Sequence, residues 1–433
     1  MGNYRIDTRC VQSGYSPANG EPRVPPIVQS TTFRYDSCDQ MGAVFDLESE
    51  GYFYTRLGNP TAGCVEAKTA DLEGGSGAIL TASGQSAVLM AVLNLCKAGD
   101  HIITSNALYG GTYNTFSRTL PDLGIDVTFV DTGVDDAALD AAFRPNTKLV
   151  YGEVLANPSL VLLDIRRFAD AAHAHGVPLI VDNTFPTPIL CRPFEHGADI
   201  IVHSTSKYMD GHARALGGAI VEYGRFDAGQ GAFHWKNGRF PGLAEPDESY
   251  HGLVYADRFG DGAFIAKARM HLMRDMGASP APLNAFLLHL GLETLALRME
   301  RHCSNAFRIA EWLETHPDVS WVNYPLLSSS PYRKLAGKYL PNGASGVISF
   351  GVAGGRQAAV RFMDSLRLGA IVTHVADART SVIHPASTTQ RQMDAEGLKK
   401  SGVREDMVRL SVGIENPDDI LEDLDQALIA ARI

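Results

Sequence analysis

Cysteine is scarce in this sequence, and none of the cysteines stands in a CxxC pair. The six residues are scattered over 433 positions, which is typical of free thiols in a reducing compartment. A disulfide-stapled fold and a metal site are therefore not expected. The N-terminal stretch MGNYRIDTRC also lacks the apolar segment of a signal peptide, so we expect a cytoplasmic protein.

Long apolar runs and an excess of basic residues are missing as well. No run reaches the ~18 apolar residues that a membrane span needs. The net charge of -11 argues against nucleic acid and anionic membranes as partners, because both require a basic surface. The remaining composition, 45% hydrophobic and 20% charged, is ordinary for a globular enzyme, and 433 residues predict two or three domains.

Short apolar runs alternate with helical patterns from about residue 61 to residue 202. This alternation predicts an α/β fold with a mostly parallel sheet. Prolines and glycines punctuate residues 1–60, which are expected to form an irregular arm, either mobile or laid on a neighbouring subunit. Residues 228–255 are expected to form a long ordered loop.

A second, smaller α/β domain is predicted toward the C-terminus. Helical patterns run from about 282 to 316 and from 418 onward, and strands are expected at 347–350 and 408–411. We place the large domain at 61–265 and the small domain at 266–433.

The stretch ADIIVHSTSKYMDGHARALGG, residues 198–218, carries the central chemical signal. A predicted strand at 199–202 leads to Ser204, Thr205, Ser206 and then Lys207. Burial lowers the pKa of a lysine, and a neutral amine can form a Schiff base with an aldehyde. The hydroxyls can bind a phosphate, so the pattern indicates pyridoxal phosphate (PLP), although alone it is more often an ordinary loop.

Two upstream positions bear on this interpretation. Asp182 ends a predicted strand, where a carboxylate points into the ligand crevice of an open α/β sheet. It could keep the pyridine nitrogen of PLP protonated, or it could cap the next turn. Gly84 and Gln85 open a helix whose free N–H groups can bind an anion, or they form a plain strand-to-helix turn.

Four further side chains have open assignments. Tyr109 precedes two glycines and can lay its ring over a planar ligand, or it can pack. Tyr54 and Arg56 suit a phosphate, or they lie in an exposed turn. Arg409 interrupts an apolar strand, where it either pairs with a buried carboxylate or binds the carboxylate of a ligand.

Seven stretches together carry a specific resemblance. They are YTRLGNPT at 54–61, LEGGSGAILTASGQSA at 72–87, LYGGTYN at 108–114, VDNTF at 181–185, FPGLAEPDESYHGLVY at 240–255, IHPASTT at 383–389 and RLSVGIE at 409–415. From about residue 5 to the C-terminus the chain resembles the fold-type-I, PLP-dependent enzymes of cysteine and methionine metabolism, the cystathionine synthase and lyase group. Within that group it is most similar to the O-acetylhomoserine sulfhydrylases. The resemblance implies a homo-oligomer, a tetramer built as a dimer of dimers.

The resemblance also implies a role for each candidate residue. Lys207 would be the Schiff-base lysine and the catalytic base, and Tyr109 would stack on the ring and act as acid or base near the leaving group. The remaining cofactor contacts would come from Asp182, Asn157, the backbone of Gly84 and Gln85, Ser204, Ser206, and the neighbouring subunit's Tyr54 and Arg56. The substrate would contact Arg409 through its carboxylate, and also His374, Thr380 and Tyr54.

The implied reaction is γ-replacement on O-acetyl-L-homoserine, in which sulfide or a small thiol displaces acetate and gives homocysteine or methionine. The alternative is a γ-lyase acting on methionine or on another γ-substituted homoserine-type amino acid, such as canavanine.

The sequence departs from the family at three places, and a fourth position distinguishes it from the methionine γ-lyases. His374 stands where the family usually has asparagine, which changes the hydrogen bonding of the pocket. Arg214 occupies a position where a small or uncharged residue is common, and an extra loop is expected at about 226–235. Gly111 replaces the cysteine usual in methionine γ-lyases, which argues against a standard enzyme of that type.

Overall fold

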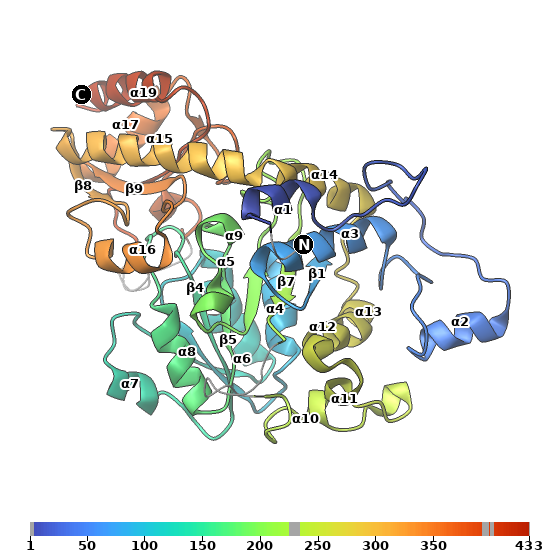
Figure 1. The fold of residues 1–433 in the computed structure, drawn as a ribbon. Helices are drawn as coiled ribbons and strands as arrows, with labels where there is room; N and C mark the ends of the chain where they lie inside the picture. Colours follow the sequence, from blue (N-terminus) through green and yellow to red (C-terminus); the bar gives the residue numbers. More distant parts are fainter. Residues whose placement is uncertain (1–3, 225–233, 392–397, 399–401, 433) are drawn as a thin grey trace.

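The computed structural model describes residues 4–224, 234–391, 398 and 402–432, so most of the extra loop expected at 226–235 lies outside the described residues. The chain builds a seven-stranded sheet and a separate five-stranded sheet, with helices packed around both (Figure 1). The predicted α/β class with a mostly parallel large sheet and a smaller C-terminal α/β unit is confirmed. None of the helices within these ranges is long and apolar enough to cross a membrane.

The large sheet has the strand order β1-β7-β6-β5-β4-β2-β3. Its strands are β1 (Gly77–Thr81), β2 (His101–Ser105), β3 (Asp126–Val130), β4 (Thr147–Glu153), β5 (Leu179–Asp182), β6 (Ile200–His203) and β7 (Gly218–Glu222). The pairs from β3 to β6 are parallel, and β7 and β1 are added antiparallel at one edge. Residues of β2, β5 and β6 are almost all buried, as expected for strands covered by helices on both faces.

The order of the strands determines where a ligand can bind. After β2 the chain adds β3 on one side, and it then returns to add β4, β5 and β6 on the other side. Such a reversal opens a crevice at the carboxyl ends of the strands, which is the usual ligand site of open α/β sheets. The carboxyl ends of β2, β4, β5 and β6 lead to Tyr109, Glu153, Asp182 and Lys207.

Helices surround the large sheet. They are α3 (Pro60–Glu73), α4 (Gly84–Leu93), α5 (Gly110–Asn114), α6 (Leu120–Asp122), α7 (Asp136–Ala141), α8 (Ile165–Ala174), α9 (Thr187–Leu190), α10 (Pro241–Ala244), α11 (Tyr255–Phe259), α12 (Ala263–Lys267) and α13 (Arg274–Met276). Short π-helical turns, Thr115–Thr119 and Ala268–Met273, continue α5 and α12. The N-terminus of α3 is fixed by Asn59, whose side chain accepts a hydrogen bond from Thr61 N–H at 2.9 Å.

The C-terminal unit contains the five-stranded sheet β10-β11-β12-β9-β8. Its strands are β8 (Val319–Asn323), β9 (Val347–Val352), β10 (Ala370–Ile371), β11 (Ser381–Ile383) and β12 (Met407–Ser411), and its helices are α16 (Arg333–Tyr339), α17 (Gly355–Ser365) and α19 (Pro417–Ala430). Helix α14 (Pro282–Glu293) packs on α3, and the long α15 (Leu295–Thr315) then runs to the small sheet (Figure 1).

The expectation that residues 1–60 are irregular needs correction. The arm before residue 60 contains two helices, α1 (Ile6–Gln12) and α2 (Cys38–Phe45). Helix α1 is too short for a clear periodicity, and it is held by tertiary contacts such as the 2.9 Å bond from Arg9 Nε to Asp71. Helix α2 stands away from the rest of the chain in Figure 1. The expected loop at 228–255 is largely observed, because its described residues 234–255 are mostly turns and irregular chain around the short α10 and a 3₁₀ turn at Glu248–Tyr250.

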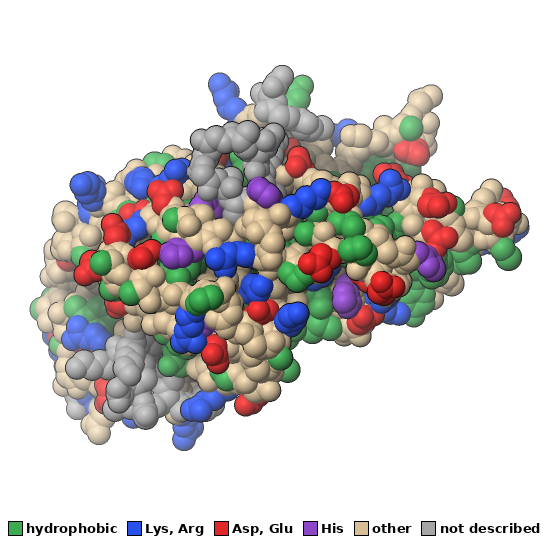
Figure 2. All heavy atoms as spheres, turned by 90° about the horizontal axis from the view of Figure 1, so that it is seen from below, with side chains coloured by type: hydrophobic (Ala, Val, Ile, Leu, Met, Phe, Trp, Pro, Cys, Tyr) green, Lys and Arg blue, Asp and Glu red, His purple; other side chains and the backbone are tan. Residues whose placement is uncertain are grey.

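Acidic and basic side chains are interspersed over the face shown in Figure 2 rather than gathered by sign.

Candidate active site

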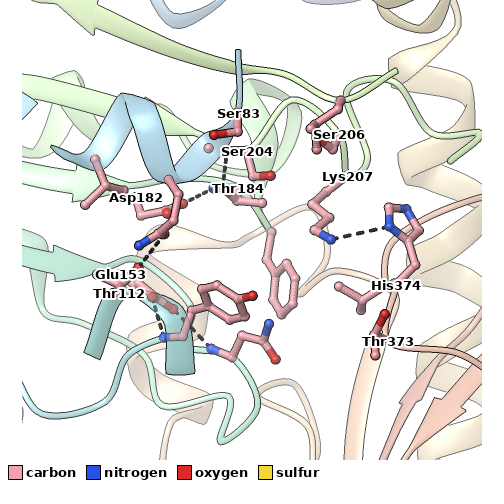
Figure 3. A pocket seen from close by; sticks show the side chains of 18 of the residues that line it. Ser83, Thr112, Glu153, Asp182, Thr184, Ser204, Ser206, Lys207, Thr373 and His374 are labelled. Atoms are coloured by element: carbon pink, nitrogen blue, oxygen red, sulfur yellow. Dashed lines mark hydrogen bonds between the residues drawn. The ribbon is translucent and has the colours of Figure 1, made fainter. Parts of the chain in front are cut away.

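A cavity of about 480 Å³ lies at the carboxyl ends of the parallel strands (Figure 3). The large sheet contributes Tyr109, Glu153, Asp182 and Lys207, and the small domain contributes Thr373, His374 and Arg409. Tyr109 and Arg409, which are 300 residues apart in the sequence, therefore meet here because the large sheet and the small domain both line the cavity. Of these seven residues, all except Glu153 and Thr373 were candidates in the sequence analysis.

The N-terminus of α4 forms one end of the cavity. Ser83 and Ser86 make a reciprocal capping box, in which the Ser83 hydroxyl accepts from Ser86 N–H at 3.1 Å. The N–H groups of Gly84 and Gln85 have no intrahelical partner at this helix start and lie beside Ser204. A Cβ at Gly84 would come within 2.6 Å of Ser204, so only glycine permits this approach.

Several side chains around this helix end already make hydrogen bonds within the protein. Gln85 directs its amide to Thr115 Oγ1 at 2.7 Å, so only its backbone is available to an anion. Ser206 Oγ accepts from Gly217 N–H at 2.9 Å and donates to the same residue's carbonyl at 3.2 Å. Thr184, which sequence analysis overlooked, accepts from Ser204 N–H at 2.8 Å and fixes the turn after β6. Helix end and hydroxyls together fit a phosphate.

Lys207 lies in the middle of the cavity. Its Nζ is 3.4 Å from His374 Nδ1. Burial, and next the positive charge of Arg409, lowers the pKa of Lys207 to about 8. Burial, and next the charge of Lys207, lowers the pKa of His374 to about 4, so the imidazole is neutral at pH 7.

Arg409 places a cation in the wall of the cavity. Its Nη1 donates to Asn157 Oδ1 at 3.1 Å, and its Nη2 donates to the carbonyls of Thr373 and His374 at 3.3 Å each. Among the described residues it has no acidic partner within ion-pair distance, and its buried Nε has no hydrogen-bond acceptor. Of the two alternatives left by the sequence, this arrangement favours a ligand carboxylate over a buried ion pair.

Two carboxylates, Asp182 and Glu153, lie side by side at the ends of β5 and β4. One oxygen of Asp182 accepts from Thr184 N–H at 2.8 Å. Glu153 accepts from Tyr109 N–H at 2.6 Å and from Asn157 N–H at 3.1 Å. Burial and the negative charge of Asp182 raise the pKa of Glu153, and burial also raises the pKa of Asp182.

Glu153 thus fixes two predicted site residues through their backbone. Its bonds set the positions of Tyr109 and Asn157, although the sequence singled out neither this link nor Glu153 itself. The signal was available, because Glu153 ends a predicted strand just as Asp182 does. Tyr109 also depends on Gly111, since a Cβ there would come within 2.5 Å of the ring. The cavity is also lined by Thr112, Thr373 and Ser83, which no sequence pattern marked as site residues.

Three candidates lie outside this cavity. The Thr380 hydroxyl donates to Glu415 at 3.0 Å, and Thr380 is buried directly before β11. Tyr54 and Arg56 line a separate surface hollow near α2, where the guanidinium lies 5.2 Å from the phenol ring. The cavity of one chain therefore receives neither Tyr54 nor Arg56 from that same chain.

The residues present fit PLP on the chemistry of their donors. The helix end with Gly84 and Ser204 suits a phosphate, and Asp182 suits a protonated ring nitrogen. Lys207 offers an amine with a lowered pKa, and Tyr109, a residue that is 43% exposed, offers a ring. These four features face one cavity.

Comparison with known proteins agrees with this chemistry. The family model for Cys/Met metabolism PLP-dependent enzymes matches residues 7–429. A homocysteine synthase of Schizosaccharomyces pombe is 46% identical, covering 98% of each chain. An O-acetyl-L-homoserine sulfhydrylase of Corynebacterium glutamicum is 44% identical, covering 98% of this chain and 97% of the relative.

A solved structure shows the same fold. The crystal structure of a Campylobacter jejuni protein described as an O-acetylhomoserine (thiol)-lyase superposes with a TM-score of 0.93 at 38% identity. It covers 98% of this chain and 100% of its own, and it carries a pyridoxyl-lysine phosphate. The chain therefore belongs to the family of Cys/Met metabolism PLP-dependent enzymes and uses pyridoxal phosphate as its cofactor.

Proposed function

We propose that this enzyme catalyses γ-replacement on O-acetyl-L-homoserine, with sulfide or a small thiol displacing acetate to give homocysteine or methionine. The observation that carries the proposal is the buried Arg409 guanidinium, which has no carboxylate partner in the described part of the chain and lies in the same cavity as Lys207. An α-amino acid supplies the missing carboxylate and presents its amino group to the cofactor. The relatives named homocysteine synthase and O-acetyl-L-homoserine sulfhydrylase support the choice of substrate.

Each cavity residue has a proposed task. Lys207 holds the cofactor and, once released, moves the proton of the substrate α-carbon; its pKa of about 8 leaves part of the amine neutral at physiological pH. Asp182 holds the ring nitrogen, and the N–H groups at Gly84 and Gln85 with Ser204 and Ser206 hold the phosphate. PLP, when bound, supplies an electron sink for the carbanion at the α-carbon.

The remaining roles concern the ring and the substrate. Tyr109 stacks on the ring and exchanges a proton near the leaving group, while Asn157 contacts the ring hydroxyl. Arg409 orients the substrate carboxylate, and His374 lies at the substrate side of the cavity. Thr380 acts indirectly through its bond to Glu415.

We infer further that Tyr54 and Arg56 complete the phosphate site of a neighbouring subunit. Their distance from the cavity of their own chain supports this inference, as does the projecting position of α2 (Figure 1). The proposed assembly is a tetramer built as a dimer of dimers, with an arm at 1–60, a PLP-binding domain at 61–265 and a small domain at 266–433. We place the enzyme in the cytoplasm.

Product analysis of the PLP-loaded protein tests the reaction. O-acetyl-L-homoserine, methionine and canavanine are each supplied with and without sulfide, and homocysteine, acetate, 2-oxobutyrate and ammonia are measured. Homocysteine and acetate formed from O-acetyl-L-homoserine only with sulfide is the expected result. Ketoacid released from any of the three without sulfide, at a higher rate than homocysteine is formed, would replace the proposal by a γ-lyase.

A further inference from the structure

The Lys207 amine makes a hydrogen-bond contact with the side chain of His374, at 3.4 Å between Nζ and Nδ1 (Figure 3). His374 lines the same cavity, and its side chain is 24% exposed to solvent. A lysine nitrogen in its ammonium form can only donate, so Nδ1 must accept and the imidazole proton must sit on Nε2.

The other nitrogen of the ring faces a carboxylate. His374 Nε2 lies 3.9 Å from Asp377 Oδ2, which is too long for a hydrogen bond but close enough for a favourable charge interaction. Within the described chain Nε2 is buried and makes no hydrogen bond. Asp377 is itself held, because its other oxygen accepts from Arg379 N–H at 2.8 Å and from Arg379 Nε at 3.1 Å.

The backbone that carries His374 is fixed from two sides. Arg409 Nη2 donates to the carbonyls of Thr373 and His374, at 3.3 Å each. Two residues later Ala376 adopts a left-handed conformation with φ 68°, which is strained for a residue with a Cβ, and its N–H donates to Ser411 Oγ at 2.8 Å. This turn brings Asp377 back to the His374 ring.

We propose that His374 is a positioning residue for Lys207, which accepts a hydrogen bond from the free Lys207 ammonium through Nδ1 and so sets the direction and protonation of that amine. Asp377 keeps the ring in the tautomer with the proton on Nε2. The role concerns the amine alone, so it does not depend on which γ-substituent the substrate carries.

The charges around Lys207 and His374 determine which of the two side chains holds the proton that they share. Lys207 faces Arg409 and Asp377, and His374 faces Lys207, Asp377, Asp210 and Arg409. The pKa of Lys207 is about 8 and that of His374 is about 4, so a proton prefers the lysine by about four powers of ten. His374 therefore receives a hydrogen bond from Lys207 and does not hold its proton.

The test measures the amine without any amino acid substrate. Apoenzyme of the full chain is mixed with PLP between pH 6 and 10, and the visible absorption band is followed as Lys207 forms a C=N bond with the aldehyde carbon and water leaves. Because only the neutral amine attacks, the rate rises with pH and levels off above the pKa of Lys207. The wild-type inflection is expected near pH 8.

Replacing the acceptor should move this inflection. His374→Leu and the smaller His374→Ala remove a bond that favours the ammonium form, so the inflection should fall by about one pH unit. His374→Asn keeps an acceptor oxygen and should stay within about 0.3 unit of wild type. His271→Leu, which deletes an exposed imidazole outside this cavity, is the matched control and should leave the inflection unchanged.

An unchanged inflection in both His374→Leu and His374→Ala would overturn the proposal. So would an equal shift in His374→Asn, because the accepting atom would then not be the cause. Since no amino acid is present, these outcomes are independent of whether γ-replacement is the reaction.

Discussion

Arg409 allows a sharp prediction because the structure contains a second arginine with similar burial and a different environment. Arg409 and Arg298 are 3% and 5% exposed, and burial lowers the pKa of each to about 10. All three nitrogens of Arg298 are bonded: Nε to Thr294 Oγ1 at 3.2 Å, Nη1 to Tyr208 O at 2.6 Å, and Nη2 to Gly291 O at 2.6 Å. Arg409 makes bonds of 3.1, 3.3 and 3.3 Å through Nη1 and Nη2, and it leaves Nε without a partner in the described chain.

Arg409→Met should therefore reduce activity far more than stability. Two hydrogen bonds to a substrate carboxylate contribute about 1.5 kcal/mol each, so kcat/KM should fall by roughly two orders of magnitude. The three lost protein bonds cost about 1 kcal/mol each, and removing a buried charge whose pKa is lowered by about 2.5 units recovers roughly 3 kcal/mol. The free energy of unfolding should change little.

Arg298→Met should show the reverse, because carbonyls enclosed by protein would lose their donor, whereas those around Arg409 can be hydrated from the cavity. The assays are kcat/KM with O-acetyl-L-homoserine and urea unfolding of both variants. The reasoning is wrong if Arg409→Met loses less than tenfold in kcat/KM, or if it is destabilised as strongly as Arg298→Met.

Three further predictions follow from single contacts. Gly84→Ala should weaken PLP binding at least tenfold in a spectral titration, because the new Cβ closes the anion site, whereas Gly337→Ala, with open space around it, should not. Burial raises the pKa of Glu222 to about 8, so the folded state keeps a proton that the unfolded state loses between pH 4.5 and 8. Wild-type stability should therefore fall as pH rises through this window, by up to a few kcal/mol, and thermal melts of Glu222→Gln should not show that fall. Mixed Lys207→Ala and Arg56→Ala subunits should regain about a quarter of wild-type activity if sites are shared between subunits, and none if each chain is self-contained.

Much of the architecture could be predicted from local sequence. The alternation of apolar runs and helical patterns predicted the parallel strands β2 to β6, because a buried strand must be apolar on both faces. Glycine and hydroxyl residues marked the start of α4 for a similar local reason, since backbone conformation and capping depend on immediate neighbours. The antiparallel β7 and the short α1 escaped, because long-range pairing and packing stabilise them.

Residue types suggested individual site members, but their grouping was visible only in the fold. Lys207 and Asp182 were identified from the strand ends that carry them, and the open question about Arg409 needed its surroundings. Glu153 was overlooked because its function is to hold two backbone N–H groups from other segments.

The sequence by itself therefore determined the α/β class, which follows from local pattern. The cofactor chemistry and the candidate lysine also came from the sequence, through the seven stretches that carry the family resemblance. Only the tertiary structure decided that Arg409 lacks a carboxylate partner within the described chain, that His374 lies 3.4 Å from Lys207, and that Tyr54 and Arg56 lie away from the cavity of their own chain. Those facts depend on distances between segments as far apart in the sequence as Tyr109 and Arg409, and such distances are set by tertiary packing rather than by any local pattern.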